Sequence, residues 1–227
     1  MPLKNKINYH QDWLFWGLNY LEIADLGCKE IINYNSNDKI KILYIPIIFN
    51  IKHGFEILIK TLIFVSEKRC FNKTDKTHDQ YELLKKIIEK INSIKLSSIN
   101  KTIKKIVDNN EAGYSKEYLE GIEPYKDIMT LKKDMEMLFN TVRSYYSLSF
   151  IKSKIEREDL IFSDKKNTLF KYPSFEVNDE DQPLVSIKLD SIVKKIELSD
   201  IVEMQIQINK TITLFIRVFQ ILLEQQK

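Results

Sequence analysis

Apolar residues recur at intervals of three and four along much of this chain, which is the pattern of amphipathic helices. The clearest stripe reads Ile48, Ile51, Phe55, Leu58 and Leu62. Pro46 precedes it, and proline suits the first turn of a helix because the N–H that it lacks would have no partner there. The spacing therefore predicts a helix that begins near Pro46 and buries one side.

A second helix is predicted nearer the N-terminus, from about Asp12 to Ile32. Asp12 precedes the periodic region and is a suitable N-cap. Gly17 lowers the helix propensity of the segment, but it would allow a neighbouring helix to approach closely. The apolar positions of this helix are Trp13, Trp16, Tyr20, Ala24 and Ile31.

A polar segment from Glu67 to Lys76 reads as an exposed loop, and a further helix is predicted to follow it. Thr77 and Gln80 have the spacing of a capping box, in which the hydroxyl and the side-chain amide each satisfy a backbone group at the helix start. The apolar positions that follow are Leu84, Ile87, Ile88 and Ile91.

The two strictest apolar seams lie in the second half of the chain. One reads Ile128, Leu131, Met135, Leu138, Val142 and Tyr145, and the other reads Ile201, Met204, Ile208, Ile212, Phe215, Val218 and Leu222. The last helix is expected to begin near Ser199 or Asp200, with Asp200 and Glu203 in capping-box relation. Such seams suit packing inside a bundle or an interface between two copies.

We therefore predict an all-α antiparallel bundle of about five main helices, with a short irregular or β segment near 160–190. The expected strands are Thr168–Phe170 and Leu184–Leu189. One domain is expected over 1–227, with a core at 10–155, an irregular segment at 156–195 and a C-terminal helix at 196–226. Asn92–Pro124 reads as an insertion between core helices.

Composition narrows the class of protein. The chain has 227 residues, 44% of them hydrophobic, with only five glycines and five prolines, which argues against a turn-rich β-sandwich. A net charge of +3 permits a local nucleic-acid patch without requiring one. Cys28 and Cys70 stand alone, and the three histidines form no metal-ligand spacing, so no metal site and no cofactor is predicted.

No signal-peptide pattern is visible at the N-terminus. The longest apolar stretches, Ile42–Ile51 and Thr211–Leu223, are interrupted by polar residues or proline and fall short of the roughly 20 residues that span a bilayer. We therefore expect a cytoplasmic protein with no membrane segment.

Three polar residues share one side of the helix after Pro46. His53, Glu56 and Lys60 are spaced so that Glu56 and Lys60 can form an ion pair. If this side faces a cleft, Lys60 could bind phosphate and His53 could transfer a proton near neutral pH. The alternative is a solvated or partly buried structural face.

Two other places combine charge with binding chemistry. His78 and Asp79 fall in the first turn of a predicted helix, where Asp79 complements the helix dipole and backbone donors can hold an anion; a plain helix start explains the same residues. Arg143 and Tyr146 end the fourth helix, where aromatic rings could stack on bases while cations neutralise phosphates. Tyr145 is better explained by core packing.

Several of these segments resemble the HEPN family of nucleotide- and RNA-associated helical bundles. The likeness is carried by DWLFWGLNYLEIADLGCKEI, by Glu56-x-x-x-Lys60 in an apolar helix, and by His78-Asp79 at the start of the next. TLFKYPSF is similar to the FRYP segment of some members, with Lys171 in place of arginine, and DSIVKKIELSDIV is similar to their C-terminal helical tail. Lys171 and Tyr172 thereby join the candidate binding residues.

The resemblance implies a helical bundle that often dimerises and acts in RNA cleavage, toxin–antitoxin pairs or antiviral defence. The ribonuclease centre of the family uses an arginine and a histidine separated by four to six residues. Here only Arg69 precedes a histidine, with eight residues between it and His78. Asn72 has the right spacing from His78 but lacks the guanidinium charge.

Three functions stay open from the sequence. The first is a non-catalytic or atypical HEPN-like protein that binds RNA or a nucleotide in a basic cleft containing Lys60, His78, Arg143 or Lys171. The second is a subunit that assembles with itself as a homodimer or with a larger complex through its apolar seams. The third is a metal-independent ribonuclease that uses His53 and His78.

Overall fold

The computed structural model describes residues 3–72, 79–93, 128–146, 149, 174–177, 185–188 and 192–224. Its helices are α1 (Leu3–Tyr34), α2 (Asn37–Ser66), α3 (Gln80–Asn92), α6 (Ile128–Tyr146) and α9 (Leu198–Glu224). Two short strands, β1 (Ser174–Val177) and β2 (Val185–Lys188), pair antiparallel, with Phe175 opposite Ile187. The predicted all-α bundle of five main helices is confirmed.

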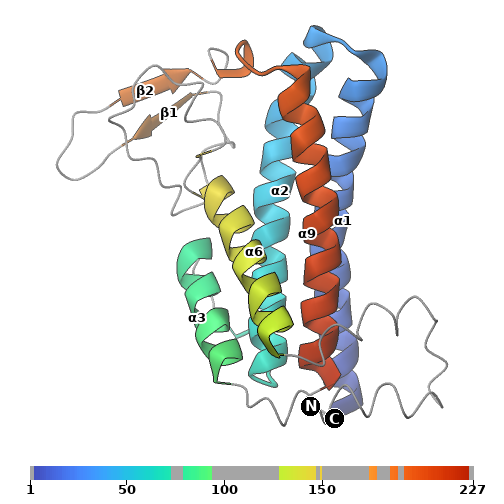
Figure 1. Ribbon diagram of the computed structural model, residues 1–227, viewed down its shortest axis with the longest axis vertical. Coiled ribbons are helices and arrows are strands. Elements are labelled where there is room, and N and C mark those ends of the chain that lie inside the picture. The colour runs from blue at the N-terminus through green and yellow to red at the C-terminus, as the bar shows by residue number, and fades with distance from the viewer. Residues whose placement is uncertain are drawn as a thin grey trace.

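α2 is the central element of the bundle. It contacts each of the other four helices. α1, α2 and α9 are long rods that lie side by side, while the shorter α6 packs against α9 and α3, and α3 packs against α2 (Figure 1). The predicted stripe of α2 is fully inside, because Ile48, Ile51, Phe55, Leu58 and Leu62 are all buried.

The two strict seams of the second half also face the interior. Within the predicted set, Leu131, Met135, Leu138, Val142 and Tyr145 of α6 are buried, and so are Ile201, Met204, Ile208, Phe215, Val218 and Leu222 of α9. The Phe55 ring of α2 joins them, with its centroid 5.5 Å from that of Tyr145 and 6.2 Å from that of Phe215. These seams are therefore used for packing within the chain.

α1 and α2 approach closely at two glycines, as predicted for Gly17. A Cβ atom on Gly17 would lie 2.6 Å from Cγ of Leu58, and one on Gly54 would lie 3.0 Å from the Gly17 carbonyl oxygen. Both distances are too short for an ordinary carbon contact. The glycines are therefore required by the packing of the two longest helices.

The predicted start of α2 is wrong, because the helix begins at Asn37 and contains Pro46. Both Pro46 and Ile42, whose carbonyl would have accepted the missing N–H, lie on the exposed side of the helix. Water can satisfy the Ile42 carbonyl there. The Pro46 carbonyl accepts a hydrogen bond from Nδ2 of Asn50 at 2.7 Å. A proline on the solvent side is thus accommodated within the helix.

The starts of α1 and α9 also differ from expectation. α1 begins at Leu3, so Asp12 is not its N-cap, and Trp16, predicted on the apolar stripe, is 68% exposed. α9 begins at Leu198, and Oδ2 of Asp200 accepts a hydrogen bond from the backbone N–H of Glu197 at 2.8 Å, so its capping partner is Glu197 rather than Glu203. Helix ends depend on single hydrogen bonds, which periodicity does not detect.

The predicted capping box of α3 is also wrong. Oδ1 of Asp79 accepts a hydrogen bond from the Glu82 N–H at 3.1 Å, so Asp79 caps this helix, and Thr77 lies outside the described residues. Nε2 of Gln80 instead donates to the carbonyl oxygen of Lys52 at 2.6 Å, which ties α3 to α2. The capping residue is therefore two positions later than predicted.

The β prediction is confirmed only at Leu184–Leu189, which contains β2. Thr168–Phe170 and nearly all of Asn92–Pro124 lie outside the described residues. β1 was not predicted, because a four-residue strand has too short an alternation to distinguish from a loop.

Two helices are long and apolar enough to cross a membrane by length and composition, α2 and the Leu198–Leu223 part of α9. Both helices are longer than the apolar stretches Ile42–Ile51 and Thr211–Leu223 considered from the sequence, and the absence of a membrane segment stays a prediction. Within the bundle, 61% of the most apolar window of α2 and 50% of that of α9 are buried. Core helices of soluble proteins share this property, and the cytoplasmic location stays a prediction.

Candidate functional site

The polar side of α2 lies inside the bundle. Nζ of Lys60 donates to Oε1 of Glu56 at 2.7 Å, and only 9% and 6% of the two side chains are exposed. Lys52, two turns before Lys60, is buried as well. The buried pair therefore fits the alternative in which this side of α2 has a structural role. It corrects the expectation that Lys60 faces a phosphate-binding cleft.

His53 lies against two aromatic rings. Its ring centroid is 4.6 Å from that of Tyr20, edge to face, and 5.8 Å from that of Phe49, nearly parallel. The predicted partner in the ribonuclease hypothesis, His78, lies outside the described residues.

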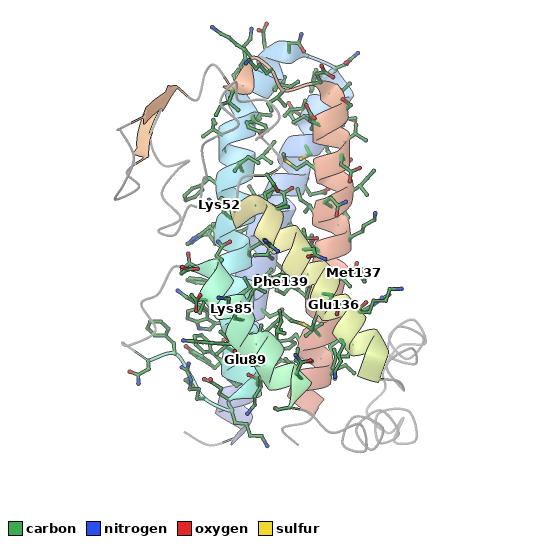
Figure 2. All side chains as sticks on the ribbon, turned by 60° about the vertical axis from the view of Figure 1, so that its left-hand side comes forward. Lys52, Lys85, Glu89, Glu136, Met137 and Phe139 are labelled. Atoms are coloured by element: carbon green, nitrogen blue, oxygen red, sulfur yellow. The ribbon has the colours of Figure 1, made fainter. Side chains whose placement is uncertain are left out.

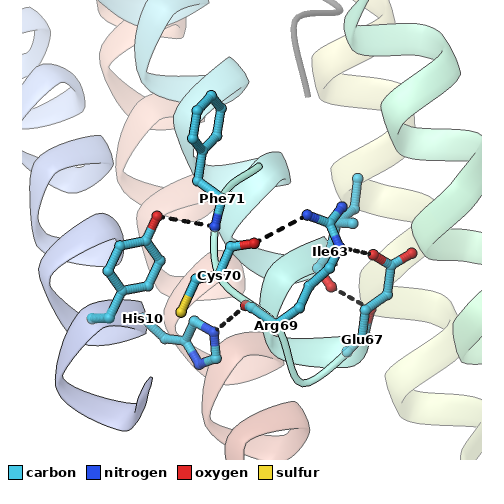
Figure 3. Close-up of polar contacts among 8 residues, drawn as sticks. His10, Ile63, Glu67, Arg69, Cys70 and Phe71 are labelled. Atoms are coloured by element: carbon cyan, nitrogen blue, oxygen red, sulfur yellow. Dashed lines mark hydrogen bonds and ion pairs between the residues drawn. The ribbon is translucent and has the colours of Figure 1, made fainter. Parts of the chain in front are cut away.

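Arg69 and a histidine do meet in the fold, but the histidine is His10 (Figure 3). Nε2 of the buried His10 lies 2.7 Å from the carbonyl oxygen of Arg69, while the guanidinium donates to the Glu67 carboxylate. The hydroxyl of Tyr9 accepts from the N–H of Phe71 at 3.0 Å. These bonds fasten the chain after α2 to the start of α1, and the arginine charge is directed to Glu67.

The other predicted site residues lie on different helices. Asp79 caps α3, and Arg143 is exposed on α6 with its guanidinium carbon 6.0 Å from the ring centroid of Phe139. His78, Lys171, Tyr172 and the side chain of Tyr146 lie outside the described part of the chain. The predicted set is thus distributed over α2, α3 and α6.

The structure offers a different site, a groove between α6 and α9 that we call the α6–α9 groove. Figure 2 shows α6, with Met137 labelled, lying across α9. The groove consists of two hollows of about 430 and 460 Å³. Asn140, Thr141 and Gln207 line both hollows, so the two adjoin.

The two hollows differ in charge. The first, the acidic end, is lined by Tyr44, Asn140, Thr141, Ser144, Tyr145, Ile196, Asp200, Glu203, Met204 and Gln207. The second, the basic end, is lined by Met137, Asn140, Thr141, Gln207, Lys210, Thr211, Thr213, Leu214 and Arg217. Of the two adjoining hollows, one therefore carries carboxylates and the other cations.

Helical periodicity explains why these polar side chains share a groove. Glu203, Gln207, Lys210 and Arg217 are separated by four, three and seven residues, so they follow one side of α9, next to its buried seam. Met137, Asn140, Thr141 and Ser144 follow one side of α6 in the same way. When the two seams pack together, these two sides face the same groove.

One residue that lines the acidic end carries a buried polar group. Tyr44 is fully buried, and its hydroxyl has no hydrogen-bond partner among the described residues. Burial raises the pKa of Tyr44 well above its ordinary value, and the neighbouring Tyr145 and Asp200 raise it further. The group is therefore a neutral O–H, and buried polar groups in folded proteins usually have a partner.

Short hydrogen bonds join groove side chains to one another and to the backbone of their own helices. Nε2 of Gln207 donates to Oε1 of Glu203 at 2.6 Å, and Oγ1 of the buried Thr211 donates to the Gln207 carbonyl oxygen at 2.7 Å. Oγ of Ser144 donates to the Thr141 carbonyl oxygen at 2.7 Å. The acidic end can accept N–H donors, and the basic end can attract an anion.

Sequence reasoning did not single out Glu203, Lys210 or Arg217 as binding residues. The available signal was the row of polar residues at helical spacing beside the last seam. That signal becomes informative only when the partner helix is known.

Among the described residues, no three or more His, Cys, Asp or Glu side chains gather in a way that could hold a metal ion. No protein-family model, curated protein or solved structure matches this chain. The resemblance to HEPN proteins therefore stays a prediction that rests on its motifs.

Proposed function

We propose that this protein binds a nucleotide, free or within an RNA strand, in the α6–α9 groove, and that it does so without cleaving RNA. The observation that carries the proposal is the joining of an acidic, amide-lined hollow to a basic one in a single groove. A nucleotide has the complementary division, with a hydrogen-bonding base at one end and anionic phosphate at the other.

The size of the groove supports a ligand of this class. Each hollow falls within the roughly 300–1,000 Å³ typical of small-molecule sites. Along the helix axis Glu203 and Lys210 are separated by about 10 Å, from the rise of 1.5 Å per residue. This distance is comparable to the separation of a base from its phosphates.

The cations of the basic end suit phosphate. Arg217 is partly buried and Lys210 is exposed, so the first could form a fixed fork on the phosphate oxygens while the second adds a solvated charge. The HEPN resemblance supports the same ligand class and, by analogy with that family, a role in antiviral defence or a toxin–antitoxin system.

The test is the affinity of purified protein for a fluorescent mononucleotide and for a short single-stranded RNA, measured by polarisation at several salt concentrations. Lys210→Ala combined with Arg217→Ala should weaken both affinities at least tenfold, and should reduce the salt dependence because fewer phosphate contacts remain. Lys85→Ala, at an exposed lysine of α3, is the matched control and should bind normally. Unchanged binding in the double variant would overturn the proposal.

The same RNA assay scores cleavage. RNA turnover that is lost in His53→Ala or His78→Ala would replace the non-catalytic proposal with the ribonuclease hypothesis. Turnover that persists in both variants would exclude those histidines as its catalytic groups.

A second candidate, self-association, is favoured by the outer side of α1. Five large apolar residues of this helix are 53–68% exposed: Phe15, Trp16, Ile23, Leu26 and Tyr34. Buried Leu21, Ala24 and Cys28 occupy the opposite side, so α1 carries large apolar residues on two sides, one buried in the bundle and one exposed. A second copy of the chain, paired through α1, would cover this surface.

The mass in solution tests this candidate. Light scattering after gel filtration should give twice the 27.0 kDa of one chain, and Phe15→Glu combined with Leu26→Glu should restore the single-chain mass. Val202→Glu, at another exposed apolar residue on α9, should leave the dimer intact. A single-chain mass at every concentration of the unmodified protein would overturn it.

A further inference from the structure

We propose that the acidic end of the α6–α9 groove recognises guanine, with Glu203 and Tyr44 as the residues that read the base. This inference rests on the proposed nucleotide site and adds its base specificity. It draws on two independent observations: the same hollow is lined by Glu203, which accepts a hydrogen bond from Gln207, and by Tyr44, whose buried hydroxyl has no hydrogen-bond partner among the described residues.

Glu203 has the chemistry that one edge of guanine requires. Guanine presents two adjacent donors, N1–H and N2–H, and a carboxylate is an acceptor-only group that can receive two parallel hydrogen bonds. The Gln207 amide donates to Oε1 of Glu203 at 2.6 Å and so orients the carboxylate. Glu203 is exposed, so a ligand can reach its carboxylate.

Tyr44 supplies the complementary donor. Guanine carries the acceptor O6 beside N1–H, and a neutral O–H can donate to it. Tyr44 lines the same hollow as Glu203, and its hydroxyl is buried. A ligand acceptor would satisfy a group that otherwise remains unsatisfied in the interior.

The other bases fit this pair of groups less well. Adenine and cytosine each place an acceptor nitrogen next to their amino group, so a carboxylate that bonds to the amino group meets a repulsive lone pair. Uracil offers one N–H flanked by two carbonyl acceptors. Asp200 and Glu203 together also repel phosphate from this end, which leaves phosphate to Lys210 and Arg217 at the other.

The experiment compares the affinities of GMP, IMP, AMP, CMP and UMP for the full chain by calorimetry. We expect the affinity for GMP to be at least about tenfold higher than the affinity for AMP, CMP or UMP. IMP, which lacks the N2 amino group, should bind between GMP and AMP. Glu203→Gln should abolish the preference and leave a phosphate-dependent affinity similar for all five ligands. Glu89→Gln, at an exposed glutamate of α3, is the control and should keep it.

Tyr44→Phe gives an independent readout. It should leave the melting temperature of the free protein unchanged or raise it, because it removes a buried group without a partner, and it should weaken GMP binding several-fold. If the unmodified protein binds all five nucleotides with equal affinity, the guanine inference is overturned. If that binding is also lost when Lys210→Ala and Arg217→Ala are combined, the nucleotide site itself is supported. An absence of nucleotide binding would overturn both.

Discussion

α2 and α9 carry similar rows of polar residues on otherwise apolar helices, but the two rows have opposite surroundings. Lys52, Glu56 and Lys60 of α2 are buried, with 7% of Lys60 as the largest exposed fraction of the three residues. Glu203 and Lys210 of α9 are exposed and line a groove. The difference shows that a row of charges on a helix is not by itself evidence of a binding surface.

The cause is what packs over each row. α3 buries Leu83, Leu84, Ile87 and Ile91 against the bundle, and Gln80 ties its start to the carbonyl of Lys52. α3 and α6 therefore lie over that side of α2 (Figure 2). On α9 the apolar seam packs against α6, and the polar row beside it lines the groove between the two helices.

The largest predicted effect concerns the buried pair. Glu56→Ala or Lys60→Ala should each lower the free energy of unfolding by about 3–5 kcal/mol, because each leaves one charge buried without its partner. Urea unfolding followed by circular dichroism measures this change. Lys85→Ala, in the exposed pair with Glu82, should cost about 0.5 kcal/mol or less.

A double replacement separates charge from packing at the same site. Glu56→Leu combined with Lys60→Met should recover most of the lost stability, because apolar side chains of similar volume often replace a buried ion pair without loss. A double variant as unstable as the single ones would show that the pair also orients α3.

The next largest effect is expected at the link between α2 and α3. Gln80→Leu should lower the unfolding free energy by about 1 kcal/mol, since it removes the 2.6 Å hydrogen bond to Lys52. Gln11→Leu, at an exposed position of α1, is the control and should leave the unfolding free energy nearly unchanged. Equal stability of Gln80→Leu and the unmodified protein would mean that apolar packing alone holds α3 on α2.

A pH-dependent effect is expected at Asp25, which connects α1 to α9. Burial alone would raise the pKa of Asp25, but hydrogen bonds from Lys29, Asn209 and Gln205 together lower it below its ordinary 3.8. Oδ1 of Asp25 accepts from Nδ2 of Asn209 at 2.8 Å. Because the folded-state pKa is lowered, this stabilisation is present above pH 3.8 and is lost as the pH falls below it.

Asp25→Asn measures that contribution. The variant should be less stable than the unmodified protein at pH 6, and the difference should shrink as the pH is lowered toward 2. A difference that stays constant over this range would contradict the assignment.

The smallest effect on stability is expected in the groove. Lys210→Ala and Arg217→Ala should each change the free energy of unfolding by less than about 0.5 kcal/mol, as is usual for surface positions. The same variants are those expected to weaken nucleotide binding. A large loss of stability would make Lys210 and Arg217 structural, like Glu56 and Lys60, and would remove the contrast between the two rows.

The sequence by itself determined the helices and their buried seams, because apolar periodicity is a local property that survives without knowledge of the partner helix. Leu58 on its seam and Gly17 at a close approach were both predicted in this way. Helix ends were less predictable: Pro46 lies inside α2 and Asp12 inside α1, since a cap is decided by individual hydrogen bonds and by solvent exposure.

Only the tertiary structure decided which polar residues are buried and which line a site. Glu56 and Lys60 look like surface charges in the sequence, but the packed bundle buries them. One hollow of the groove is lined by Asn140 of α6, Gln207 of α9 and Tyr44 of α2, which come from segments distant along the chain. No local spacing encodes that meeting, because it follows from how three separate seams pack around one core.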